Sequence, residues 1–176
     1  SGIWKSIQKS QHVSMTEEVG TSEAPCGKFY IDTWQSGSNV VSFSLIDRMG
    51  ILDKTKFYGG KIYTGETAGE VIDAIMADAG VTEYKVAEDV AAIQLYGHIP
   101  ICTHREALQQ VVFACGAVAG CDRQGYISIR MPDRSTTSTI TADRKFMGTT
   151  VEMSDYVSGI SIAYKSYSLQ AEASEI

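Results

Sequence analysis

Two histidines and a cysteine lie within seven consecutive positions of the sequence, at His98, Cys102 and His104. Imidazole and thiolate groups are zinc ligands, and this is the run of the chain with the clearest metal-ligand character. A zinc site would need a fourth ligand that converges on the other three in a tetrahedron, and no Cys-x-x-Cys pair supplies one. We therefore predict that the protein has no metal site and no bound cofactor.

His104 also lies close to Glu106, but residues two positions apart on a helix do not face each other. The two are therefore not an obvious acid–base pair, and we predict that His104 is a surface histidine beside a helix cap. His12, the third histidine, lies in an irregular stretch and indicates nothing by itself.

A group of acidic residues surrounds the segment 67–93. Two of them would have to flank a cleft at a defined separation to hydrolyse a glycan, and a solvated helix face is the simpler interpretation. The residues are Asp73, Asp78, Glu83, Glu88 and Asp89. Ser44, Ser128 and Ser161 lack the Gly-x-Ser-x-Gly pattern of a nucleophile elbow, and Gly59-Gly60 lacks the rest of a phosphate-binding loop. We expect no catalytic residue and predict that the protein is not an enzyme.

Aromatic residues are concentrated in the predicted strands. They are Tyr30, Trp34, Phe43, Phe57, Tyr58, Tyr63, Tyr156, Tyr164 and Tyr167. A role in the core or in a subunit interface is the default for such residues, and a platform for carbohydrate is the alternative.

Composition indicates a globular protein of one or two domains. The chain has 176 residues, 44% hydrophobic and 20% charged, with a formal net charge of −6. Because no stripe of lysine and arginine could neutralise phosphates, a nucleic-acid partner is disfavoured. No apolar run approaches the roughly 20 residues that a membrane helix needs. Four cysteines without a paired pattern indicate structural thiols and synthesis in a reducing cytoplasm.

Two capped amphipathic helices are predicted in the middle of the chain. Thr67 with Glu70, and Thr103 with Glu106, form capping boxes that open helices near 67–80 and 103–119. Apolar stripes follow at helical spacing: Val71, Ile72, Ile75, Met76 and Ala79 in the first, and Leu108, Val111, Val112, Cys115 and Val118 in the second. Gly80 ends the first helix, and Gly116 and Gly120 are candidate ends of the second.

Strands are predicted on both sides of these helices. Residues 28–34 and 40–47 are predicted to form a β-hairpin, and its unpaired edges indicate partner strands elsewhere. Residues 57–63 are predicted to form a further short strand. Residues 93–101 form a loop or an edge strand. Residues 126–131 and 156–169 alternate at period two. Thr16 to Pro25 is interpreted as a loop or linker.

These elements predict an α+β fold with two amphipathic helices packed on mostly antiparallel β-structure. We divide the chain into a polar N-terminal segment (1–28), a β-hairpin region that belongs to a β-domain (29–63), an α/β module (64–133) and a C-terminal strand region with its tail (134–176).

Several segments of the sequence resemble hub or tail-tip proteins of phage and prophage tails, akin to the late control protein D and baseplate hub families. The segments are Gly27 to Trp34, Val41 to Asp47, Leu52-Asp53-Lys54, Thr67 to Ile72, Gly97 to Pro100 and, most strongly, Thr103 to Val111. The resemblance covers roughly Gly27 to Ser168 and carries no catalytic signature. It implies a structural role in the virion tail, with tail tube, baseplate or tape-measure proteins as partners.

Members of that family are larger than this chain and often form a three-fold ring at the end of the tail tube. The resemblance therefore implies a homo-oligomer, with a trimer for the full-length protein. Two alternatives remain open: a hydrolase domain that acts on cell-wall glycan or peptide, with the acidic group and His98 or His104 as candidates, and a carbohydrate-binding module that uses the strand aromatics.

Overall fold

The computed structural model describes residues 6–37, 40–59 and 61–133, with seven isolated positions beyond them (135, 139, 141, 143, 158, 159 and 161). The chain divides into two compact units, Ser1–Met131 and Pro132–Ile176, and the elements below all belong to the first. The predicted strand at 156–169 falls almost wholly outside the described residues. The four-part division made from the sequence stays a prediction.

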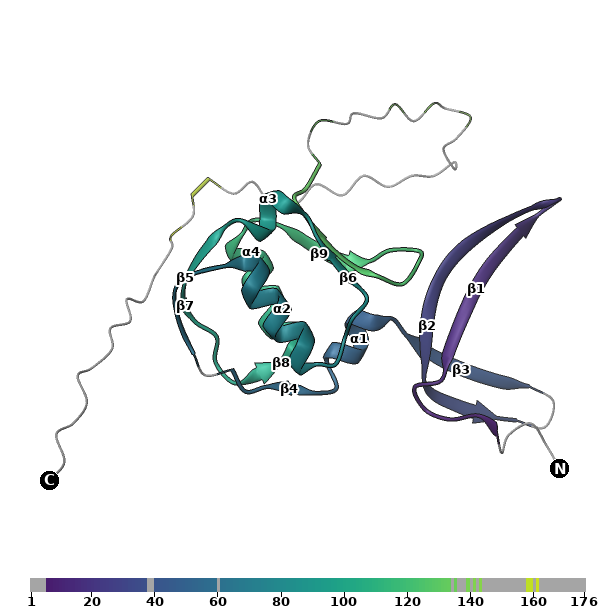
Figure 1. The fold of residues 1–176 in the computed structure, drawn as a ribbon. Coiled ribbons are helices and arrows are strands. Elements are labelled where there is room, and N and C mark those ends of the chain that lie inside the picture. The colour runs from purple at the N-terminus through teal and green to yellow at the C-terminus, as the bar shows by residue number, and fades with distance from the viewer. Residues whose placement is uncertain are drawn as a thin grey trace, which may run out of the picture. The chain divides into compact units, whose positions relative to one another are not determined.

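Two helices form the centre of the first unit, and short sheets surround them (Figure 1). The helices are α2 (Ala68–Asp78) and α4 (His104–Ala114). β5 (Ile62–Thr67) pairs antiparallel with β7 (Gln94–His98), and β4 (Lys56–Phe57) pairs antiparallel with β8 (Cys102–Thr103). β10 (Ile127–Arg130) lies between β6 (Tyr84–Val86), which is parallel to it, and β9 (Val118–Cys121), which is antiparallel. The predicted α+β class is confirmed.

The capping boxes predicted from the sequence are both present. The Thr67 side chain accepts from the amide of Glu70 at 3.3 Å, and the Glu70 carboxylate accepts from the amide of Thr67 at 2.8 Å. Thr103 and Glu106 repeat the arrangement at 3.1 and 2.8 Å. Each box satisfies two backbone groups that the first helical turn leaves without partners.

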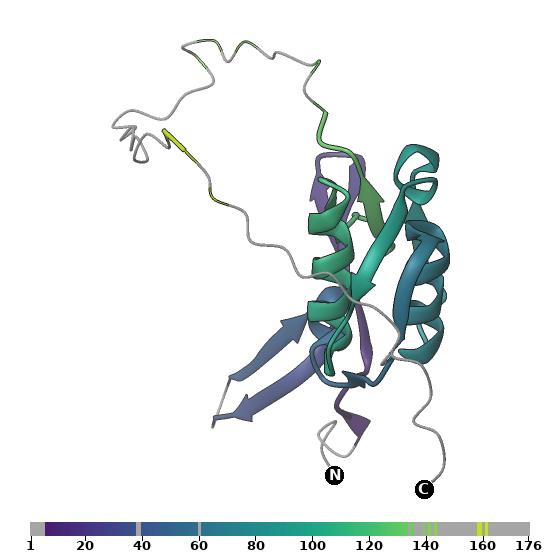
Figure 2. The same ribbon diagram turned by 90° about the vertical axis from the view of Figure 1, so that its left-hand side faces the viewer.

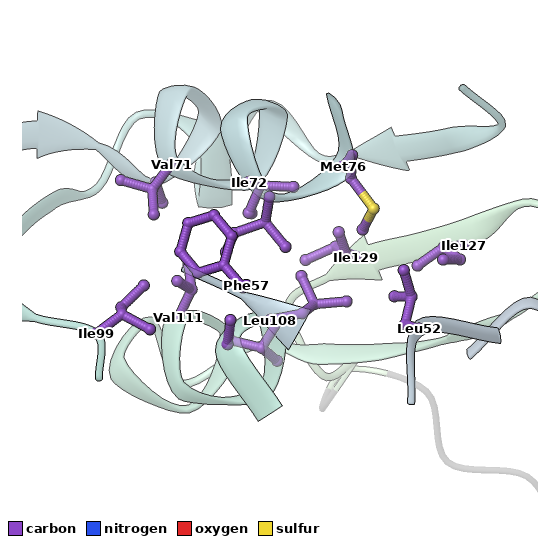
Figure 3. Close-up of a cluster of buried hydrophobic side chains, with 14 of the residues drawn as sticks. Leu52, Phe57, Val71, Ile72, Met76, Ile99, Leu108, Val111, Ile127 and Ile129 are labelled. Atoms are coloured by element: carbon purple, nitrogen blue, oxygen red, sulfur yellow. The ribbon is translucent and has the colours of Figure 1, made fainter. Parts of the chain in front are cut away.

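The apolar stripes of the two helices meet in one core (Figure 3). Its fully buried side chains include Leu52, Val71, Ile72, Ile75, Met76, Leu108, Ile127 and Ile129. The last two alternate on β10, as the period-two pattern of that segment predicted. Each large apolar side chain buried in this way stabilises the fold by about 1.5–3 kcal/mol before the entropy of ordering it is subtracted.

The second helix ends earlier than the sequence suggested. α4 stops at Ala114, its cap is Cys115, and Gly116 follows with a φ of +65°. Glycine adopts this left-handed conformation without strain, so it ends the helix. The predicted extension to residue 119 is wrong, since Val118 begins β9 and lies exposed instead of continuing the helical stripe.

A three-stranded antiparallel sheet precedes the helices, with the order β1-β2-β3. β2 (Ser22–Ser36) and β3 (Val41–Ile46) form the predicted hairpin, and β1 (His12–Val19) supplies a partner strand for its open edge. The interpretation of Thr16 to Pro25 as a loop or linker is wrong. These residues lie in β1, β2 and the turn at Gly20, because pairing with a long neighbouring strand overrides weak local preference for β-structure.

The short helices α1 and α3 and the strand β6 were also not predicted from the sequence. α1 (Arg48–Leu52) follows β3, and the side chain of its cap Asp47 accepts a hydrogen bond from the amide of Gly50 at 2.8 Å. The acidic segment after α2 contains β6 and the one-turn helix α3 (Glu88–Ala91).

Candidate functional site

His98, Cys102 and His104 lie on β7, on β8 and at the first position of α4. His104 is bound by residues from outside this run. Among the described residues, no group of three or more histidine, cysteine, aspartate and glutamate side chains is placed to hold a metal ion. The four cysteines are free thiols.

His104 is a buried histidine, and its predicted surface position is wrong. Its side chain is about 3% exposed, with Nδ1 2.8 Å from the Thr55 hydroxyl and Nε2 2.9 Å from Asp78 Oδ2. Because an ionised carboxylate can only accept, we assign the proton to Nε2, which donates to Asp78. In the neutral ring Nδ1 then accepts from Thr55. We call Thr55, Asp78 and His104 the histidine node.

The histidine node links three segments that are far apart in the sequence. Thr55 lies just before β4, Asp78 is the last residue of α2, and His104 opens α4. The amide of His104 also donates to the Thr55 carbonyl at 3.2 Å. The centre of the imidazole ring lies 5.9 Å from the centre of the Phe57 ring. A hydroxyl, an imidazole and a carboxylate in a row suggest nucleophilic catalysis. The same two hydrogen bonds also connect the start of α4 to the end of α2 and to the residue before β4, and the imidazole between them is buried.

Three of the five acidic residues singled out from the sequence bind separate partners. Asp73 accepts from the Tyr84 hydroxyl at 2.6 Å, Asp78 belongs to the histidine node, and Glu83 pairs with Arg48. The hydrogen bond to Asp73, with burial and the carboxylate charge, raises the pKa of Tyr84 to about 12. These three carboxylates are therefore more than a solvated helix face, since each binds a side chain from another element.

Arg48 joins the N-terminal sheet to the helical core. It is buried, and its guanidinium donates to the Tyr30 hydroxyl at 2.7 Å, forms an ion pair with Glu83 and lies 5.8 Å from the centre of the Tyr30 ring. Burial opposes its charge, but the bonds to Glu83 and Tyr30 outweigh burial and raise the pKa of Arg48. No spacing or motif in the sequence indicated this residue, because its partners come from β2 and from the loop after α2.

The strand register places apolar side chains on one face of the N-terminal sheet. Directly paired residues share a face, and successive residues of a strand alternate between faces. The pairs Val13–Phe29, Met15–Gly27, Ile31–Leu45, Trp34–Phe43 and Ser36–Val41 fall on one side, which we call the apolar sheet face. Tyr30, with its bond to Arg48, lies on the other side.

The apolar sheet face is only partly covered. Ile31 at its centre is buried, but Met15 is 47%, Trp34 38% and Phe43 45% exposed. Phe57 and Tyr63 are core residues, and this agrees with the core role predicted for the aromatic residues. Tyr156, Tyr164 and Tyr167 lie outside the described residues.

Comparisons with known proteins give one structural likeness of interest. No protein-family model matches the chain, and no curated protein matches it significantly. Among solved structures, the chain is similar to the 43 kDa tail protein of prophage MuSo2 from Shewanella oneidensis, with a TM-score of 0.45 and 17% identity. The match covers 70% of this chain and 39% of that one, so this chain spans well under half the length of the MuSo2 protein. No helix in the described part of the chain has the length and apolar character needed to cross a membrane.

Proposed function

We propose that this protein is a structural module of a phage or prophage tail, of the hub or tail-tip kind. It assembles with tail tube, baseplate or tape-measure proteins after synthesis in the host cytoplasm. It acts by presenting surfaces to its neighbours and not by turnover. The name of the MuSo2 protein agrees with this proposal, which rests on the sequence resemblance and on the apolar sheet face.

The observation that carries the proposal is the exposure of the apolar sheet face. A sheet normally buries one face against another layer, and contiguous exposed apolar surface marks a contact site. Here the cross-strand neighbours Trp34 and Phe43 face solvent together in the isolated chain, and Met15 faces solvent farther along the same sheet face. A module of an assembly would cover them with a neighbouring subunit, which agrees with a homo-oligomer and with a trimer of the full-length protein.

The same surface favours assembly over the two alternatives. A carbohydrate platform combines aromatic rings with polar groups that bind hydroxyls, whereas the aromatic pair Trp34–Phe43 shares its face mainly with aliphatic side chains. A glycan hydrolase needs two carboxylates that flank one cleft. The carboxylates Asp73, Asp78 and Glu83 instead bind separate partners.

The decisive experiment is to purify tails from the induced prophage and identify their proteins by mass spectrometry. We expect the polypeptide to be present, and its absence from intact tails would contradict the proposal. A Trp34→Ser/Phe43→Ser variant is expected to fold but to be left out of tails. A Gln35→Ser variant, changed on the opposite sheet face, is the matched control and is expected to be incorporated. Clearing of peptidoglycan in a zymogram by the wild-type chain would favour the hydrolase instead.

A further inference from the structure

The outer parts of β1 and β2 form a two-stranded ribbon that no other strand in the described part of the chain joins. β1 pairs with Ser22 to Tyr30 of β2, whereas β3 pairs with Tyr30 to Ser36. In Figure 1 and Figure 2 the two strands continue together beyond β3. We call residues 14–26 the acidic arm. Every residue of the arm is exposed, so both faces of the ribbon are open to solvent.

The acidic arm carries negative charge without positive charge. Glu17, Glu18 and Glu23 lie near its tip, and the sequence has no lysine or arginine from Ser10 to Gly27. Glu18 and Glu23 are paired directly across the two strands, where like charges repel each other and weaken the pairing. Among the described residues, no ion pair includes any of the three glutamates. Because a two-stranded ribbon is only marginally stable by itself in water, the arm is stabilised most by a partner that brings positive charge to its tip.

A basic surface lies at the base of the same arm. Lys28 follows the arm on β2, and a methyl group built on Gly125 would lie 2.8 Å from its Cβ atom, so Lys28 packs against the turn between β9 and β10. Arg123 is exposed in that turn. The Lys85 ammonium lies 3.5 Å from the Asp122 carboxylate at the start of the turn. We call Lys28, Lys85 and Arg123 the basic turn, and their three positive charges exceed the single negative charge of Asp122.

The tip of the acidic arm is too far from the basic turn of its own chain to pair with it. Ser14 is the cross-strand partner of Lys28, and Glu18 lies four residues farther along β1, at a distance of about 13 Å. Salt screens exposed charges over about 8 Å at physiological ionic strength, so the two surfaces attract each other only weakly within one chain. Between two chains this limit does not apply, since the tip of one arm can lie directly on the turn of the other.

We propose that the acidic arm of one copy of this chain binds the basic turn of a second copy. This inference rests on the homo-oligomer of the proposed function and identifies a surface that holds its copies together. The complementary charges favour a second copy as the partner, whereas the glutamates would repel nucleic acid and anionic membranes. Val19, which is 67% exposed at the tip, adds apolar area that the contact covers.

Sedimentation velocity of the purified 176-residue chain, over a range of protein concentrations, measures the contact. We expect the chain to self-associate at low salt. The association should weaken by at least about tenfold at high salt, because salt screens the attraction between arm and turn. Association through the apolar sheet face would not weaken in this way, since burial of apolar surface does not depend on charge.

Two charge-reversed variants test the two sides of the contact. The arm variant is Glu17→Lys/Glu18→Lys/Glu23→Lys, and the turn variant is Lys28→Glu/Arg123→Glu. Each variant alone should associate at least about tenfold more weakly than the wild type, because arm and turn then carry charge of the same sign. An equimolar mixture of the two should associate as the wild type does, since each arm again meets a turn of opposite charge. One chain with all five substitutions should also recover the association.

Lys56→Glu and Glu88→Lys, which change exposed charges outside both surfaces, are the matched controls and are expected to associate as the wild type does. Circular dichroism should show the wild-type fold for every variant, because all the substituted residues are exposed. A chain that does not self-associate, association that charge reversal leaves unchanged, or a loss that neither mixing nor combining the substitutions restores would each overturn the inference. A basic protein other than this chain would then be the partner of the arm. The tail assignment would still stand if purified tails contain the polypeptide.

Discussion

Replacing His104 by leucine tests whether the histidine node stabilises the fold. Leucine keeps most of the buried apolar volume but removes both side-chain hydrogen bonds, one at 2.8 Å to Thr55 and one at 2.9 Å to Asp78. A neutral hydrogen bond of this kind contributes about 1 kcal/mol to the free energy of unfolding. The bond to the Asp78 carboxylate would contribute more in a buried setting. That side chain is 54% exposed, so we also assign it about 1 kcal/mol after screening by solvent.

The expected loss for His104→Leu is therefore about 2 kcal/mol in the free energy of unfolding. The loss is not larger, because Thr55 is exposed and Asp78 half-exposed, and water can replace the imidazole as their partner. Urea denaturation at pH 7, followed by circular dichroism, measures the change. Gln109→Leu, an exposed substitution on the same helix, is the control and should stay within about 0.5 kcal/mol of the wild type.

A double-mutant cycle with Thr55→Val identifies the hydrogen bond itself. Since both substitutions remove the same bond, the double variant should lose about 1 kcal/mol less than the sum of the single losses. Additive losses, or a loss below about 0.5 kcal/mol for His104→Leu, would refute the reasoning. The histidine would then fill space without binding its neighbours.

Three further predictions concern local features. Thr67→Ala removes one capping box and is expected to lower the free energy of unfolding by about 1 kcal/mol, measured by urea denaturation, and no loss would contradict the capping role. Gly116→Ala should lower the free energy of unfolding by about 1 kcal/mol, because alanine is strained in the left-handed backbone conformation. Gly125→Ala should lower it by more, because its new methyl group would also lie 2.8 Å from a β2 side chain. Equal losses for the two variants would count against that contact. The hydrogen bonds from Lys61 and from the backbone amides of Thr64 and of Glu66 itself lower the pKa of Glu66 to about 2. This carboxylate therefore stabilises the fold above about pH 4.5, and its contribution disappears as the pH falls towards 2. Lys61→Met should raise the pKa of Glu66 in an NMR titration, and an unchanged titration would refute the ion pair.

The sequence alone was enough to predict features that depend on contacts between residues three or four positions apart. Both capping boxes, the start of each long helix and the face that each buries could be identified from residue types and spacing. The hairpin at 28–47 and the alternation of 126–131 were equally local, and the structure confirms them. The candidate site was not predictable in this way, since spacing pointed to His98, Cys102 and His104 as neighbours and gave no indication of Thr55 or Arg48.

Tertiary contacts decided the features on which function depends. β1 is a strand because β2 pairs with it, and β6 is a strand because β10 lies beside it. His104 is buried because Thr55, 49 residues earlier, and Asp78, 26 residues earlier, meet its two ring nitrogens. The exposure of the apolar sheet face also follows from which elements lie next to it. Hydrogen bonding and burial between distant residues depend on the folded chain, and local residue patterns carry no record of those partners.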